Sequence, residues 1–272
     1  MTTFVWLCRI VFLAFLLFVG WRVVRKLRVL RAQLAAYRRG DYREQLKIVE
    51  GFRTKKSEPP HYLFFHGSAC FQLGRLEEAE RALRRSLSME TNAALRTLCR
   101  DELGLLLMEQ GRWDEAAACF RTCMVEAPNR GGGHRAMAEL LLRHGEQYAA
   151  ALHEARAAVA ADRSKKAGHG KLAKEDYAYN LSESLAFLAW ALARNSADPD
   201  EVKSALNEAF ALCGETAKPI LARLHFCAGN AYAVLGNTAE STRHFERATE
   251  VDPQGNYGRL ARAAVAAVNP SA

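Results

Sequence analysis

Residues 101–128, DELGLLLMEQGRWDEAAACFRTCMVEAP, place small and large side chains at intervals that decide the fold. Gly104 and Ala116 lie where a soluble helix usually carries larger residues, and Phe120 follows the second of them by one helical turn. Gly111 separates two segments of helical periodicity. No residue in this stretch is an obvious nucleophile or metal ligand. The spacing therefore indicates helix packing rather than a catalytic site.

The same spacing occurs in residues 62–87 and 224–253. When Gly104 is counted as position 8 of a unit, all three stretches carry small residues at positions 8 and 20. They also share glycine at position 15 and a large apolar residue at position 24. This pattern resembles the tetratricopeptide repeat, a helix-turn-helix unit of 34 residues.

The resemblance implies that positions 8 and 20 lie where the two helices of a unit cross. A larger side chain there would push the helix axes beyond the usual separation of about 8–10 Å. The packing residues predicted in this way are Gly67, Ala79, Gly104, Ala116, Ala138, Ala189, Ala205 and Gly229.

The predicted fold is all-α: a right-handed α-solenoid of about five such helix pairs with a capping helix, preceded by one transmembrane helix. Residues 28–56 resemble a degenerate first unit, residues 57–254 hold the array, and residues 255–272 form a capping helix and tail. Within the array, units are expected near residues 60–93, 97–130, 131–162, 182–215 and 222–254.

Residues 4–24, FVWLCRIVFLAFLLFVGWRVV, are apolar apart from Arg9 and Arg22. A helix of this length spans roughly 30 Å, the thickness of a bilayer core. The uncharged part, residues 10–21, is short enough to suit a signal peptide as well. However, no small-residue cleavage pattern follows it, and a basic flank does. We therefore predict an uncleaved membrane anchor within residues 1–27.

Basic residues are concentrated beside this apolar run. Residues 1–56 carry a net charge of +10, whereas the remainder carries −2, so the charge does not indicate a nucleic-acid partner. The flank consists of Arg22, Arg25, Lys26, Arg28 and Arg31. By the positive-inside rule, it leaves the C-terminal body in the cytoplasm, as in bacterial inner-membrane assembly proteins of similar layout. The flank is either only a topology signal or also a binding surface for anionic lipid headgroups.

The stretch 162–176, DRSKKAGHGKLAKED, is expected to be a solvated basic loop. Its Gly170-Lys171 pair does not complete a phosphate-binding loop, because Lys165 and Leu172 occupy the required glycine and hydroxyl positions. The sequence contains no C-x-x-C and no H-E-x-x-H motif, and Cys119 and Cys123 are expected to pack within a helix. We therefore predict no enzyme activity, no cofactor and no metal.

Resemblance to the tetratricopeptide-repeat family implies that a protein or peptide partner binds in a concave groove lined by the first helix of each unit. The groove residues carried over are Phe64, Ser68, Phe71, Leu105, Met108, Arg135, Glu139, Trp190, Phe226 and Asn230. This set is more apolar than a groove that faces only water. Either it binds a partly apolar segment of a partner, or neighbouring helices or the basic loop cover it.

These features together predict a single-pass, membrane-anchored adaptor or scaffold that binds a protein segment. The alternative is an exported repeat protein that acts in envelope assembly or transport on the non-cytoplasmic side of the membrane.

Overall fold

The computed structural model describes residues 19–21, 23–25, 27–52, 59–145, 147–165, 168, 170–214 and 217–268. Within these residues the chain is entirely α-helical with short turns, and no strand is present. The described residues between 19 and 38 are helical and precede α2. The expected all-α solenoid is therefore confirmed for the described chain.

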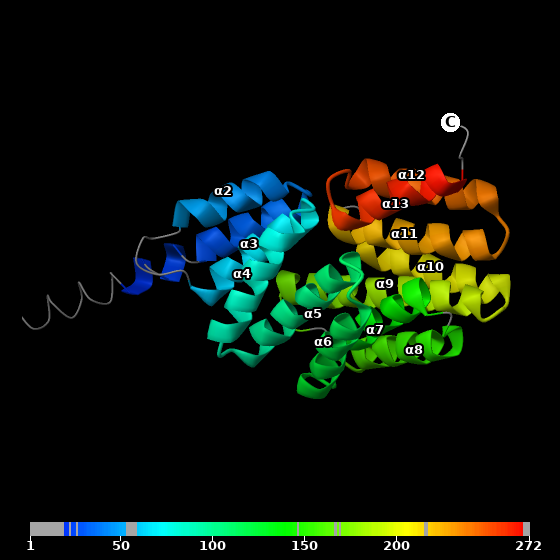
Figure 1. Ribbon diagram of the computed structural model, residues 1–272, viewed down its shortest axis with the longest axis horizontal. Helices are drawn as coiled ribbons and strands as arrows, with labels where there is room; N and C mark the ends of the chain where they lie inside the picture. The colour runs from blue at the N-terminus through cyan, green and yellow to red at the C-terminus, as the bar shows by residue number, and fades with distance from the viewer. Residues whose placement is uncertain are drawn as a thin grey trace, which may run out of the picture.

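Successive helices pack as antiparallel pairs along the molecule (Figure 1). The five pairs after α2 are α3 with α4, α5 with α6, α7 with α8, α9 with α10, and α11 with α12. The helix bounds are α2 Tyr42–Phe52, α3 Pro60–Gln72, α4 Leu76–Met89, α5 Ala93–Glu109, α6 Trp113–Glu126, α7 Gly131–His144, α8 Tyr148–Ser164, α9 Lys171–Arg194, α10 Pro199–Cys213, α11 Lys218–Val234, α12 Thr238–Val251 and α13 Asn256–Val268.

In three of the five pairs, α3 with α4, α5 with α6, and α11 with α12, a glycine with positive φ sets the turn between the two helices. Gly74 has φ +75° and Gly111 has φ +73°, the left-handed conformation that favours glycine. In the first of these turns, the N–H of Gly74 donates to Phe71 at 2.9 Å and the N–H of Arg75 donates to Cys70 at 2.9 Å. This pair of hydrogen bonds is a Schellman motif, which ends α3 and directs the chain back along it.

The two helices of a pair are in close contact where they cross. A Cβ atom added to Gly104 would lie 2.3 Å from a ring carbon of Phe120, and one added to Gly229 would lie 2.6 Å from Phe245. At Gly67 the nearest atom, on Leu83, would be 2.7 Å away. The alanines at the corresponding positions of the other helices are buried: Ala79, Ala116, Ala138, Ala189 and Ala205.

The predicted basic loop 162–176 is mostly helix. α8 continues to Ser164 and α9 begins at Lys171, so only residues 165–170 connect them. No helix breaker follows Gly170, and Lys171 pairs with Glu175 one turn later at 3.8 Å. Asp162, the first residue of the predicted loop, is buried and accepts hydrogen bonds from Gly131 and Ser184. A solvated loop was therefore the wrong prediction for most of this stretch.

α13 packs against α11 and α12 and reaches back to the beginning of the chain (Figure 1). The hydroxyl of Tyr42, at the start of α2, donates a hydrogen bond to Asp252, which precedes α13. The backbone N–H of Asn256 donates to the side-chain oxygen of Gln72, on α3, at 3.0 Å. The C-terminal helix therefore joins the two ends of the array, in addition to covering the last pair as expected of a cap.

No helix among the described residues is long and apolar enough to cross a membrane. The predicted anchor lies largely outside these residues, because the description begins at Val19 and omits Arg22 and Lys26.

Candidate functional site

The predicted groove residues lie on the first helix of each pair, but most of them are buried. Phe64 and Asn230 are half-buried. The other eight are at most 8% exposed: Ser68, Phe71, Leu105, Met108, Arg135, Glu139, Trp190 and Phe226. The sequence left two alternatives, an open groove that binds a partner and a covered groove, and in the structure the groove is covered. The cover that the described residues show includes α13.

Tyr257 is the residue of α13 that enters the interior. Its hydroxyl donates to Glu139 at 2.7 Å, and its ring lies 5.6 Å from that of Phe226. The guanidinium of Arg223 lies 4.5 Å from the centre of the Tyr257 ring, in a cation–π arrangement. Burial, together with the neighbouring Glu139 carboxylate, raises the pKa of Tyr257 well above its ordinary value, so it remains a neutral hydrogen-bond donor.

Arg259, one half-turn further along α13, closes the end of the groove beside α3. Its guanidinium donates to the backbone carbonyls of Gln72 and Phe71. It also contacts the side-chain oxygen of Asn256 at 3.3 Å. Because the last carbonyls of α3 have no partners within their own helix, Arg259 acts as a C-terminal cap supplied from the other end of the chain.

A buried ion-pair network connects the first helices of three pairs. Glu183 on α9 lies 3.0 Å from Arg135 on α7 and 2.7 Å from Arg223 on α11. Burial opposes the charge on Arg223, but Glu183 and other acidic neighbours outweigh it and raise the pKa of Arg223 well above its ordinary value. The interior of the solenoid therefore contains paired charges as well as the buried apolar residues of the predicted groove.

Two carboxylates of α5 add negative charge to this interior. Glu102 accepts a hydrogen bond from Ser68 at 2.9 Å, whereas one oxygen of Asp101 has no hydrogen-bond partner among the described residues. Burial raises the pKa of both carboxyl groups. Arg135 and Arg223 act in the opposite direction on Asp101 by stabilising its ionised form. The arrangement can hold charge, and of these two carboxylates Glu102 is the one with an identified hydrogen-bond partner in the described chain.

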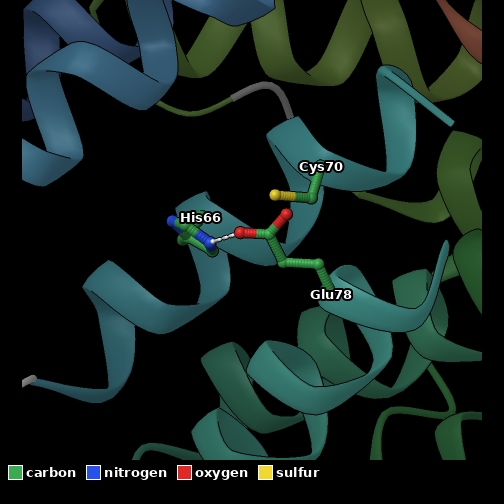
Figure 2. Close-up of side chains that lie close together, drawn as sticks. All are labelled: His66, Cys70 and Glu78. Carbon is green, nitrogen blue, oxygen red and sulfur yellow. Dashed lines mark hydrogen bonds and ion pairs between the residues drawn. The ribbon is translucent and has the colours of Figure 1, made fainter. Parts of the chain in front are cut away.

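A second cluster lies outside the groove, between α3 and α4. His66, Cys70 and Glu78 bring a ring nitrogen, a thiol and a carboxylate together within 4.8 Å (Figure 2). The ring Nε2 of His66 lies 3.1 Å from a carboxylate oxygen of Glu78. Cys70 is fully buried, and burial followed by the charge of Glu78 raises the pKa of its thiol to about 12. Sequence motifs missed this cluster because its third member comes from the following helix.

The remaining predicted features lie at the surface or in the core. Arg25, Arg28 and Arg31 of the basic flank are exposed. Cys123 is buried, with its sulfur 3.5 Å from the carbonyl of Thr97, and Cys119 is half-buried. These two thiols pack within α6, as the sequence led us to expect.

The described geometry agrees with the comparisons to known proteins. Residues 60–92 match the family model of the tetratricopeptide repeat. The structure is similar to that of TTC0263, a thermophilic TPR protein of Thermus thermophilus, with a TM-score of 0.51 and 16% sequence identity over 76% of this chain and 98% of that chain. The chain therefore has the tetratricopeptide-repeat fold.

Two further solved structures are similar to this chain at lower TM-scores. Yeast Tom70 has a TM-score of 0.47 and 13% identity over 84% of this chain and 47% of that chain. YrrB, described as a TPR protein with an unusual peptide-binding site, has a TM-score of 0.39 and 17% identity, over 80% and 97% of the two chains. A search of curated proteins finds no match to the sequence.

Proposed function

We propose that this chain is a membrane-anchored scaffold that binds a protein or peptide partner and has no catalytic step of its own. Binding of protein or peptide partners is the activity consistent with its tetratricopeptide-repeat fold. The observation that carries the membrane part of the proposal is the exposed apolar surface of the helix before α2.

Every described apolar side chain from position 19 to position 27 is exposed: Val19, Trp21, Val23, Val24 and Leu27. Only from Val29 onward does one face of this helix pack on the body, where Gln33 donates a hydrogen bond to the carbonyl of Gln45. An apolar surface of this extent is costly in water. It continues the apolar sequence run that ends at Val24, and lipid is the environment that suits both.

Removing residues 1–27 tests the anchor. We expect the full chain to remain with the membrane after carbonate extraction, and the shortened chain, which retains the packed part of the helix, to move to the soluble fraction. Equal release of both chains would contradict the anchor.

The partner site is proposed to be the concave groove after α13 has moved away. Tyr257 and Arg259 cover the groove with contacts that a partner segment could replace: one hydroxyl–carboxylate bond and donors to two backbone carbonyls. A partner that offers a tyrosine hydroxyl or a cationic side chain would satisfy the same acceptors.

The variant Arg259→Ala tests this model because it removes contacts of the cover and keeps every predicted groove side chain. Arg262→Ala is the matched control, since Arg262 lies on the same helix and contacts only the carbonyl of Pro253 among the interactions described. In crosslinking from membranes, Arg259→Ala should increase recovery of the partners seen with the full chain. Adding Phe71→Ala should remove that increase. Equal recovery with Arg259→Ala and Arg262→Ala would place the partner site elsewhere.

We further propose that the body lies on the cytoplasmic side of the membrane. Five of the native cysteines are buried and unsuitable as reporters: Cys70, Cys99, Cys123, Cys213 and Cys227. Val125→Cys supplies a reporter, because Val125 is 81% exposed. A membrane-impermeant thiol reagent should label this variant only after cells are permeabilised. Labelling of intact cells beyond the level of the unchanged chain would favour the exported alternative.

A further inference from the structure

We propose that His66, Cys70 and Glu78 bind one Zn²⁺ ion between α3 and α4, with a fourth coordination position open to the adjoining pocket. The three side chains supply an imidazole nitrogen, a thiolate sulfur and a carboxylate oxygen, which are the ligand types that zinc uses in proteins. This site is separate from the concave groove.

The distances require only small movements. A tetrahedral zinc ion with bonds of about 2.0–2.3 Å holds its ligand atoms roughly 3.3–3.8 Å apart. The donor atoms of the cluster lie within 4.8 Å of one another, and those of His66 and Glu78 are already 3.1 Å apart. Rotation about side-chain bonds is therefore sufficient to complete the coordination.

The backbone places these ligands firmly. His66 and Cys70 are four residues apart on α3, so they lie on the same face of that helix. Glu78 lies in the first turn of α4, directly after the Schellman turn at Gly74. All three side chains point toward one another in Figure 2. Because one tight turn connects the two helices, the separation of the ligands is fixed by local structure.

The charges also favour a divalent cation. A thiolate at Cys70 and a carboxylate at Glu78 supply two negative charges, which balance one Zn²⁺ bound by a neutral histidine. In the metal-free chain burial is the largest effect that opposes ionisation of the Cys70 thiol, and Glu50 adds to it, whereas Arg75, which approaches Glu78 to 3.8 Å, favours it. In the metal-free chain the pair of His66 and Glu78 is half-buried, so the carboxylate is already partly removed from water.

The open position follows from the pocket beside the cluster. His66 and Glu78 both line a pocket of about 370 Å³, whose other walls include Val49, Tyr62 and Arg81. Cys70 is not part of the pocket wall and approaches from the buried side. A three-residue set leaves one tetrahedral position for water or an incoming ligand, unlike the closed four-residue sets of structural zinc sites.

A second histidine–glutamate pair in the chain shows what the cluster would be without Cys70. His134 and Glu154 form a similar pair, 2.7 Å apart, between α7 and α8. No third ligand joins that pair among the described residues. Binding that depends on all three ligands should therefore occur between α3 and α4 and not between α7 and α8.

Titration of the purified full chain with Co²⁺ tests the proposal, because a thiolate–cobalt bond gives a charge-transfer band in the near ultraviolet. We expect one equivalent of Co²⁺ to produce the band and Zn²⁺ to displace it. Cys70→Ala should abolish the band. Glu78→Gln and His66→Gln should each weaken binding by more than the roughly 10- to 100-fold typical of an outer-sphere partner.

Cys99→Ala and His134→Gln are the matched controls, as each removes a residue of the same type outside the cluster. Both should bind Co²⁺ as the unchanged chain does. Circular dichroism confirms that each variant is folded before titration. The proposal is overturned if the folded, unchanged chain gives no band. It is also overturned if the band survives Cys70→Ala, or if the controls lose it as well.

Discussion

At the scale of single residues, the fold depends on positions where no side chain fits. Gly104 lets the ring of Phe120 lie against the backbone of α5. Gly229 in the same way lets the ring of Phe245, on α12, lie against the backbone of α11. The pairs with alanine at this position bury it completely, as at Ala138 and Ala189. Side-chain volume at one position of each unit therefore sets how closely its two helices approach.

Gly104→Ala is expected to destabilise the chain by about 1–3 kcal/mol, the usual cost of overpacking a core. The added methyl group would lie 2.3 Å from Phe120, so the ring must move. Gly51→Ala is the control, because a Cβ there has no neighbour within 4 Å. That change should be neutral or stabilising by up to about 1 kcal/mol through helix propensity. Urea denaturation measures both; equal midpoints would contradict the packing argument.

These crossing positions could be predicted from the sequence because both contacting residues belong to the same repeat. Gly104 and Phe120 lie on two consecutive helices, α5 and α6, that a single short turn connects, so the spacing within one repeat identifies both residues. The role of Tyr257 could not be predicted in this way, since its partner Glu139 is 118 residues away and in no periodic relation to it. His66, Cys70 and Glu78 were likewise missed, because a search for sequential metal motifs does not combine ligands from two helices.

At the scale of helices, the interior of the solenoid is held by charges that alternate between neighbours. Arg135 on α7 and Arg223 on α11 lie on either side of Glu183 on α9. The carboxylate therefore connects three helix pairs at once. The expected groove residues Arg135 and Glu139 belong to this structural network, which explains why polar residues occupy positions that the family uses for partner contacts.

Glu183→Gln is expected to lower the free energy of unfolding by about 3–5 kcal/mol, because it removes the carboxylate that pairs directly with two buried guanidinium groups. Glu208→Gln is the control. Glu208 also pairs with an arginine, at 2.7 Å from Arg163, but both side chains are about half exposed. This second change should cost less than about 1 kcal/mol. Comparable losses in the two variants by chemical denaturation would contradict the proposed role of burial.

The contact between α11 and α12 predicts a dependence of stability on pH. His225 and His244 lie with their Nδ1 atoms 2.8 Å apart, beside Phe210. Burial, followed by the charge of its neighbour His244, lowers the pKa of His225 to about 3, and burial also lowers that of His244. Arg243 and Arg247 lower the pKa of His225 further, while Glu240 raises that of His244.

Both imidazoles therefore stay neutral in the folded chain while the unfolded chain binds protons. The stability that depends on neutral His225 is complete above the unfolded pKa of about 6.5 and is lost as the pH falls toward 3, by about 1 kcal/mol per pH unit, and the lowered pKa of His244 acts in the same direction. His225→Phe should reduce this slope, measured by denaturation between pH 7 and pH 4. His153→Gln, which changes an exposed histidine, should leave it unchanged. Parallel curves for all three chains would contradict the assignment.

At the scale of the whole molecule, the array is joined end to end. Asp252 accepts hydrogen bonds from Tyr42 and from the N–H of Gly255, and Gly40 lies beside it. Repeat spacing predicts helices and their pairing, because those contacts are local. It does not predict how strongly successive pairs rotate, and this rotation decides whether the concave face stays open. For that reason the sequence left the covered and open grooves as equal alternatives.

Tyr42→Phe tests the junction because it removes only the hydroxyl that joins residues 210 positions apart. Burial and the neighbouring Asp252 carboxylate raise the pKa of Tyr42, so the hydroxyl is a neutral donor whose loss leaves a half-satisfied buried acid. Hydrogen exchange should become faster both in α2 and in the turn before α13. Tyr232→Phe, which removes a hydroxyl from α11, should change neither segment. In an open solenoid each repeat contacts only its neighbours, so a Tyr42→Phe effect confined to residues 27–72 would mean that the ends are not joined in solution.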